Sequence, residues 1–125
     1  MSAPATERIA EAVHRYLDLV ANGTAAQIAE CYAPDGTLSD PEGSEPTRGR
    51  GAIEAFYKPL EAIGRETELL TLRMSGGAAA FHFRVRSILP DQVVEIEPID
   101  VMTFDDDGLI TSMRAFWSQA DMRVR

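Results

Sequence analysis

The stretch Val93–Phe104, with the sequence VVEIEPIDVMTF, sets the predicted fold because apolar residues recur in it at every second position. Side chains of a β-strand alternate between its two faces, so this period predicts a strand with one apolar face. That face carries Val94, Ile96, Pro98, Asp100, Met102 and Phe104. Asp100 is the one carboxyl group on it, and this makes Asp100 the first candidate functional residue.

A carboxyl group in the middle of a core face has to be paired, or neutral and hydrogen-bonded. Burial raises the pKa of an acid and favours the protonated form, which is a hydrogen-bond donor. The pattern therefore predicts that Asp100 is a donor in a dry site. The alternative is that Pro98 bends the strand, or marks a bulge, and turns Asp100 towards solvent.

Further strands are predicted on both sides of this stretch, so the second half of the chain is expected to form an antiparallel meander. They span Thr67–Arg73, Ala78–Leu89 and Leu109–Trp117, and the last residues, Ser118–Arg125, form a polar tail. Glycine-containing turns at Ser75–Gly77 and Asp105–Gly108 join successive strands. In the stretch 78–89 the period of two places Phe81, Phe83 and Val85 on one face.

Amphipathic helices are predicted in the first half, where apolar residues fall at helical spacing. They span about Thr6–Ala21, Thr24–Tyr32 and Arg50–Ile63, with Thr6 as the cap of the first helix and Pro59 as a kink or early end of the third. Between the second and third helices we expect a turn at Ala33–Gly36, a short strand at Thr37–Ser39 and a polar loop at Glu42–Gly49.

Helices followed by strands are typical of an α+β domain whose helices pack on one face of an antiparallel sheet. The chain has 125 residues, enough for one domain with its own core, and we expect a single domain over residues 1–125. A strongly curved sheet closed by helices forms a cone. The interior of such a cone suits a small apolar ligand.

Composition argues against several classes of partner. The formal net charge of −8 disfavours nucleic acid and anionic membranes. No apolar run approaches the ~20 residues of a membrane helix, and the first residues lack the apolar core of a signal peptide. Cys31 is the only cysteine, so we expect no internal disulfide and a reducing, cytoplasmic location. His14 and His82 lack metal-ligand spacing, so no metal is expected.

The three tyrosines of the chain, Tyr16, Tyr32 and Tyr57, each fall on the apolar stripe of a different predicted helix. Buried phenols need hydrogen-bond partners, and three of them on helices that pack together can satisfy one another. The alternative is three separate core tyrosines, each bonded to backbone or water.

Tyr16 and a protonated Asp100 are two donors that face an apolar pocket, and two donors on one oxygen form an oxyanion hole. Asp40 stands at the end of a predicted strand, next to a polar loop, where it can stay ionised and act as a base. The walls of the pocket are predicted to be Phe83, Met113, Phe116 and Trp117, although ordinary core packing would also explain these four residues. No residue has the surroundings of an activated nucleophile.

At these residues the chain resembles the Δ5-3-ketosteroid isomerase family, within the superfamily of cone-shaped α+β domains typified by nuclear transport factor 2 (NTF2). The matching stretches follow the family order: RYLDLV around Tyr16, DPEGSEP from Asp40, FY at Phe56-Tyr57, PIDVMTF around Asp100 and SMRAFW at Ser112–Trp117. They extend over nearly the whole chain. The resemblance implies an NTF2-like fold with three N-terminal helices on a curved, mainly antiparallel sheet.

The resemblance also implies roles for the candidate residues. Asp40 is the base that moves a proton from C4 to C6 of a 3-oxo-Δ5-steroid, while Tyr16 and protonated Asp100 hold the dienolate oxygen at C3. A neutral aspartic acid of this kind is the known device of the family. Tyr57 and Tyr32 form the supporting hydrogen-bond network behind Tyr16. The family uses no cofactor or metal and forms homodimers through the sheet.

One departure from the family pattern is Glu42, which follows Asp40-Pro41 where the family usually has an apolar residue. A second carboxylate there would raise the pKa of Asp40 by repulsion, or would simply point to water. Two other functions stay open. One is a different reaction in the same cone, such as cyclisation, dehydration or epoxide opening. The other is a module that binds a steroid or another apolar small molecule without turnover, since fold alone does not fix function.

Overall fold

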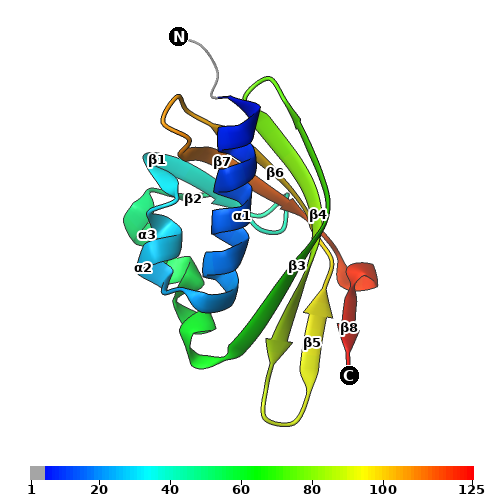
Figure 1. Cartoon of the computed structure of the whole chain (residues 1–125). Coiled ribbons are helices and arrows are strands. Elements are labelled where there is room, and N and C mark those ends of the chain that lie inside the picture. The colour runs from blue at the N-terminus through cyan, green and yellow to red at the C-terminus, as the bar shows by residue number, and fades with distance from the viewer. Residues whose placement is uncertain (1–4) are drawn as a thin grey trace.

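The protein consists of α-helices laid against one face of a curved, eight-stranded sheet (Figure 1). The computed structural model describes residues 5–125. The helices are α1 (Thr6–Asn22), α2 (Ala25–Ala29) and α3 (Arg50–Tyr57), and a 3₁₀ turn at Lys58–Ala62 continues α3. This arrangement confirms the predicted α+β class and places the helices in the first half of the chain.

The strands run mostly antiparallel and form one continuous sheet. They are β1 (Tyr32–Ser39), β2 (Thr47–Arg48), β3 (Gly64–Ser75), β4 (Ala78–Ile88), β5 (Val93–Ile96), β6 (Ile99–Phe104), β7 (Ile110–Phe116) and β8 (Met122–Val124). Their order across the sheet is β2-β1-β7-β6-β4-β5-β8, and β3 pairs with the other side of β4. The parallel pair is β1 with β7, which brings the end of the first half against the last long strand.

The predicted strand Val93–Phe104 is divided, and the prediction of one continuous strand was wrong. Proline has no N–H to donate to a strand ladder, and the pairing is interrupted at Glu97-Pro98 between β5 and β6. Both pieces pair with β4, through Val85–Ile96 and Phe81–Asp100. The alternation holds after the break, because Asp100 is 2% exposed and Met102 0%, whereas Ile99 and Thr103 are exposed. The alternative that Pro98 turns Asp100 to solvent was therefore wrong.

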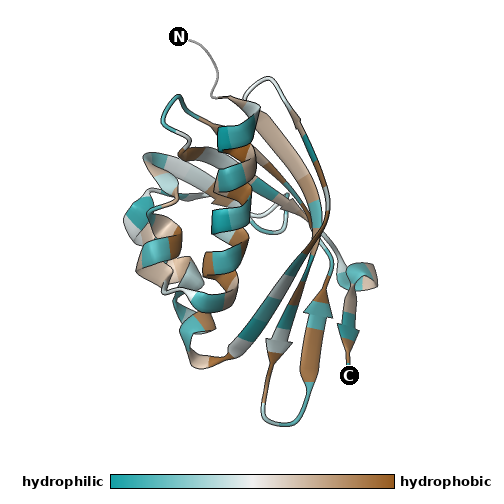
Figure 2. Cartoon of the chain, in the orientation of Figure 1, coloured by the Kyte–Doolittle hydropathy of each residue, from teal (hydrophilic) through white to brown (hydrophobic). Residues whose placement is uncertain are grey.

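Helix α1 crosses the concave face of the sheet and buries one stripe, which consists of Ile9, Val13, Tyr16, Leu17 and Val20. Figure 2 shows brown and teal segments alternating along this helix, as expected when one side faces the core. Two side chains of β3 bind its backbone: the Thr67 hydroxyl donates to the Leu17 carbonyl at 2.9 Å, and Arg65 donates to the Gly23 carbonyl at 3.0 Å. Thr6 lies inside the helix and Ala5 is the N-cap, contrary to the prediction for Thr6.

The segment after α1 differs most from the prediction. Thr24 and Gln27 form a capping box that starts α2, but this helix ends at Ala29 and Tyr32 already belongs to β1. The predicted turn at Ala33–Gly36 also lies inside β1. There the pairing with β7 is irregular, and the register moves from Tyr32–Ile110 to Thr37–Ser112. Gly36 is needed at this point because a Cβ would lie 3.0 Å from the Ile110 carbonyl oxygen.

The third helix, the loop after β1 and the C-terminal tail were also predicted from the sequence. Pro59 lies in the 3₁₀ turn directly after α3, so the predicted early end of the third helix is confirmed. The predicted polar loop Glu42–Gly49 contains the short strand β2, and the polar tail contains a 3₁₀ turn at Gln119–Asp121 and strand β8. Among residues 5–125, none of the helices combines the length and the hydropathy required to span a bilayer.

Candidate active site

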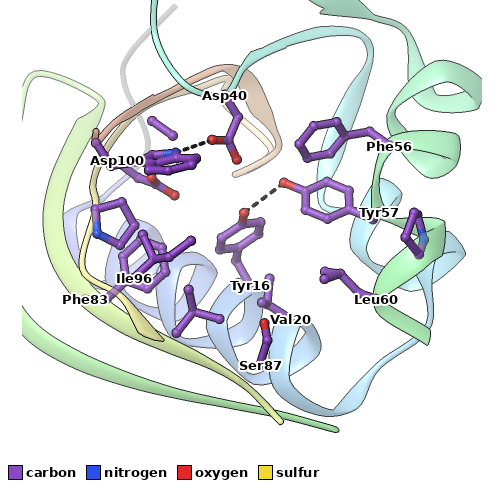
Figure 3. A pocket seen from close by; sticks show the side chains of 15 residues that line it. Tyr16, Val20, Asp40, Phe56, Tyr57, Leu60, Phe83, Ser87, Ile96 and Asp100 are labelled. Carbon is purple, nitrogen blue, oxygen red and sulfur yellow. Dashed lines mark hydrogen bonds between the residues drawn. The ribbon is translucent and has the colours of Figure 1, made fainter. Parts of the chain in front are cut away.

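A cavity of about 240 Å³ lies between α1, α3 and the inner face of the sheet (Figure 3). Its lining is mostly apolar, with residues from α1, the α3 region, β4, β5 and β7. At one end five polar side chains line it together: Tyr16, Asp40, Tyr57, Asp100 and Trp117. Residues far apart in the sequence thus meet at one end of an apolar pocket, as the predicted cone required.

The three tyrosines form one hydrogen-bonded chain. The Tyr16 and Tyr57 hydroxyl oxygens lie 2.8 Å apart, and the Tyr57 and Tyr32 hydroxyl oxygens are also 2.8 Å apart. All three side chains are buried, so each phenol has exchanged water for another phenol. The alternative of three separate tyrosines was wrong. Tyr32 takes part from β1 rather than from a helix, because strand pairing with β7 holds it beneath α3.

The pKa of Tyr16 reflects this chain. Burial raises its pKa well above the ordinary range of a phenol, and the nearby Tyr32 phenol adds to that effect. The hydrogen bond with Tyr57 opposes the rise and lowers the pKa of Tyr16. Tyr16 is therefore a neutral donor at ordinary pH, and its partner Tyr57 makes it a more acidic one.

Asp100 is the second residue of β6, where Phe81 of β4 and Ala115 of β7 flank it. Burial is the main cause that raises the pKa of Asp100 well above the usual range of a carboxyl group, and the charge of Asp40 is the second cause. This shift favours the protonated form of Asp100, which is a hydrogen-bond donor in the lining of the pocket. Figure 3 shows the Asp100 and Tyr16 side chains directed into the same space.

Asp40 follows the last residue of β1 and receives a hydrogen bond from the indole of Trp117, whose Nε1 lies 2.6 Å from the Asp40 Oδ1. Burial raises the pKa of Asp40, and this indole N–H lowers it by stabilising the carboxylate. A hydrogen-bond donor therefore stabilises the carboxylate of Asp40, whereas no such donor lowers the pKa of Asp100. The pocket holds two aspartates whose surroundings push their pKa values apart, which suits one base and one acid.

Glu42 does not line the pocket, although it is only two residues from Asp40. Its carboxylate pairs with Arg114 of β7 at 2.8 Å, and its backbone N–H donates to the Ala115 carbonyl at 2.7 Å. Arg114 lowers the pKa of Glu42 through this hydrogen bond. The second carboxylate is directed to a cation on the surface, and Glu42 is not among the groups that shift the pKa of Asp40.

Two of the four predicted wall residues line the pocket and two do not. Phe83 and Trp117 contact the cavity. Met113 is buried in the core at 2% exposure, outside the lining. Phe116 is 40% exposed and lies on the opposite face of β7, under the Arg114 guanidinium. The period of two explains Phe116, because its neighbours Ala115 and Trp117 are the ones that face inwards.

Other lining residues were not predicted as part of the site. The apolar ones include Val20, Phe56, Leu60, Val85 and Ile96. The signal was present in the sequence, since Val20 is one helical turn after Tyr16 and Ile96 shares the face of Asp100. The hydrogen bond from Trp117 to Asp40 was also missed. Its partners are 77 residues apart, and no local pattern connects them.

The remaining titratable candidates lie elsewhere. His82 contacts Glu97 on the outer face of the sheet, at 3.1 Å, and Cys31 donates to the Gln27 carbonyl of α2. Among residues 5–125 no group of three or more histidines, cysteines or acids is arranged to hold a metal ion.

The fold and the pocket define an NTF2-like α+β domain with a polar site at one end of an apolar cavity. More particularly, the chain belongs to the SnoaL-like domain family, which matches residues 13–113. It is 58% identical over 113 residues to a steroid Delta-isomerase of Nocardioides simplex, and the match covers 90% of this chain and 92% of that protein.

More distant similarities are to an epoxide hydrolase and to an epoxide hydrolase/cyclase-like enzyme. The chain is 29% identical over 125 residues to the epoxide hydrolase LasB of Streptomyces lasalocidi, a match that covers 89% of this chain and 42% of that protein. A solved structure of SalBIII, described as an epoxide hydrolase/cyclase-like enzyme with a role in pyran ring formation in polyether salinomycin, superposes with a TM-score of 0.87. Its sequence identity is 26%, and the match covers 95% of this chain and 97% of that one.

Proposed function

We propose that this protein is a steroid Δ-isomerase that moves the C5–C6 double bond of a 3-oxo-Δ5-steroid to C4–C5. Its isomerase class rests on the 58% identity to the steroid Delta-isomerase, over 90% of this chain. The observation that carries the chemical proposal is the pocket itself, in which Asp40 and Asp100 have different surroundings and Tyr16 stands beside them.

The proposed reaction is a proton transfer within one substrate molecule. The Asp40 carboxylate takes a proton from C4, the electrons of that C–H bond form the C3–C4 double bond of a dienolate, and the negative charge collects on the oxygen at C3. Tyr16 and protonated Asp100 donate hydrogen bonds to that oxygen and stabilise it. Asp40 then returns the same proton to C6, which leaves the conjugated Δ4-enone. No electron leaves the substrate, so the reaction needs no redox partner.

The apolar walls make this arrangement effective. Donors act more strongly on a developing charge where water is excluded and the local dielectric is low. The tyrosine chain is already in place before a substrate arrives, so no reorganisation of Tyr16 is required. Tyr57 and Tyr32 are positioning residues in this proposal, because they act through Tyr16 and not on the substrate.

The test is turnover of 5-androstene-3,17-dione by the purified protein, followed through the ultraviolet absorbance of the conjugated enone. We expect fast, saturable growth of this absorbance. If the absorbance grows only at the rate seen in buffer but a phenolic steroid binds tightly, the protein would be a steroid carrier or would catalyse another reaction in the same pocket. If the absorbance does not grow and no steroid binds, the similarity to the steroid isomerase would extend to the fold and not to the function.

We also propose a homodimer that forms through the outer face of the sheet. Ile99 of β6 and Phe116 of β7 are direct cross-strand neighbours there and are 47% and 40% exposed. Paired apolar side chains on an open sheet face favour contact with a second copy. Sedimentation equilibrium should give twice the mass of the chain. In Phe116→Asp the measured mass should fall towards that of a single chain. A cytoplasmic location is proposed from Cys31, the only cysteine, which is free in the structure.

A further inference from the structure

The end of the pocket away from Asp40 contains one polar side chain, that of Ser87. The other polar lining residues belong to the group around Tyr16 and the two aspartates, and the residues near Ser87 are apolar, such as Val20 and Val85. Figure 3 shows Ser87 and Val20 on one side of the pocket and Asp40 on the other. Ser87 thus stands alone at the far end of an apolar cavity.

The pairing register of the sheet shows how far Ser87 lies from Asp100 along strand β4. Asp100 pairs with Phe81 of β4, and Ser87 lies six residues further along the same strand. At about 3.3 Å per residue, roughly 20 Å of strand separates the two positions. The pocket therefore has a hydrogen-bonding group near each end, with apolar walls between them.

Arg65 of β3 is the cross-strand neighbour of Ser87. Directly opposed residues on antiparallel strands have Cβ atoms about 5 Å apart and share a face of the sheet. One guanidinium nitrogen of Arg65 donates to the Gly23 carbonyl, while its Nε and Nη1 are buried and have no hydrogen-bond partner within residues 5–125. Arg65 lines a neighbouring cavity and not this pocket, so it places a positive charge with unsatisfied donors behind Ser87 rather than in the pocket wall.

We propose that Ser87, with Arg65 beside it, is a second anchor that selects steroids with an oxygen acceptor at the ring-D end. This inference rests on the proposed function for its substrate class, with the 3-oxo group at Tyr16 and Asp100. The Ser87 hydroxyl donates to a keto or hydroxyl oxygen at C17. A steroid with only hydrogen there gains nothing from Ser87, and its apolar end covers polar groups that lose their water. Sites built around such groups reject analogues that lack the matching oxygen.

The experiment measures equilibrium binding of two product-like steroids, 4-androstene-3,17-dione and 4-androsten-3-one, which differ only in the oxygen at C17. Trp117 is the only tryptophan of the chain and lines the pocket, so its fluorescence reports binding without turnover. We expect the dione to bind about three- to tenfold more tightly, the range for one neutral hydrogen bond. In Ser87→Ala the affinity for the dione should fall to that for 4-androsten-3-one. The affinity for 4-androsten-3-one should not fall.

Two variants make the result specific. Ser87→Thr keeps the hydroxyl and should keep the preference for the dione, whereas Ser75→Ala, at an exposed serine of β3 outside the pocket, should change neither affinity. A preference that survives in Ser87→Ala, an equal loss for both steroids, or binding of neither steroid would overturn the assignment. If the protein shows no turnover but keeps the preference for the dione, the proposed isomerase activity would be wrong and the assignment of Ser87 as an anchor would still hold.

Discussion

Asp100 and Asp40 line the same pocket, yet the structure supports them in different ways. Asp100 lies in β6, which pairs with β4 on one side and β7 on the other, and burial dominates its pKa. Asp40 sits where β1 ends, and the Trp117 indole N–H partly offsets its burial. The difference shows how one residue type can be prepared for two proposed roles: burial within the sheet favours the neutral carboxyl, and a donor beside the strand end offsets part of the cost of ionisation.

The largest effect is expected from Asp40→Asn, which removes the proposed base. General acid–base catalysis contributes about 10²- to 10⁴-fold, so kcat for 5-androstene-3,17-dione should fall by that factor. Steroid binding should survive, because the donors and the walls remain. The matched control is Asp35→Asn, at an exposed aspartate of β1, which should turn over like the wild type. Unchanged turnover in Asp40→Asn would remove Asp40 from the mechanism.

Asp100→Leu should have the next largest effect, because it removes one donor to the dienolate oxygen. Loss of one oxyanion-hole donor costs about 10²- to 10³-fold in kcat. The affinity for a phenolic steroid, whose phenolate resembles the dienolate, should fall as well. Asp100→Asn keeps an N–H donor and should lose less. Equal affinity of the wild type and Asp100→Leu for the phenolic steroid would mean that Asp100 donates nothing there.

A smaller effect, visible in the pH profile, is expected from Trp117→Phe. The indole N–H stabilises the Asp40 carboxylate, so its removal raises the pKa of Asp40. The base must be ionised to work, and the acidic limb of kcat/KM against pH should therefore move to higher pH. Phe56→Leu changes another aromatic wall residue without this N–H and should leave the limb in place. A limb that stays put in Trp117→Phe would show that the hydrogen bond does not tune the base.

The smallest effect is expected from Glu42→Gln. The charge of Glu42 is paired with Arg114 at the surface, so its removal should leave the acidic limb of the pH profile where it is. Glu45→Gln, at an exposed glutamate in the same loop, provides the comparison. If Glu42→Gln alone moved the limb to lower pH, Glu42 would be raising the pKa of Asp40 by repulsion, and the ion pair with Arg114 would not shield it.

The sequence predicted Asp100 better than its surroundings. The period of two in Val93–Phe104 was enough to place Asp100 in the core, because alternation is a local property that survived the break at Pro98. Tyr32 was assigned to a helix, since Ile28, Cys31 and Tyr32 continue a helical stripe. The backbone leaves the helix at Ala29, where strand pairing with β7 takes over, and helical spacing cannot detect that pairing.

What the sequence did not predict depends on contacts between distant segments. Trp117 was expected as a wall, but its N–H reaches Asp40 only because β1 and β7 run side by side. Strand β8 pairs with β5 through backbone groups, so the polar side chains of the tail gave no sign of it. Ser87 follows Phe83 and Val85 at the same period of two, and this signal could have placed it on the pocket side.

The most direct measurement of the difference between the two aspartates is a ¹³C NMR titration of the carboxyl carbons in protein labelled at aspartate. Asp40→Asn and Asp100→Asn would identify the two resonances. We expect an ionised Asp40 and a protonated Asp100 at pH 7, and a lower pKa for Asp100 in Asp40→Asn, because the repelling charge is gone. An Asp100 resonance that is already ionised at pH 7, or two carboxyls that titrate together, would contradict the division into one acid and one base.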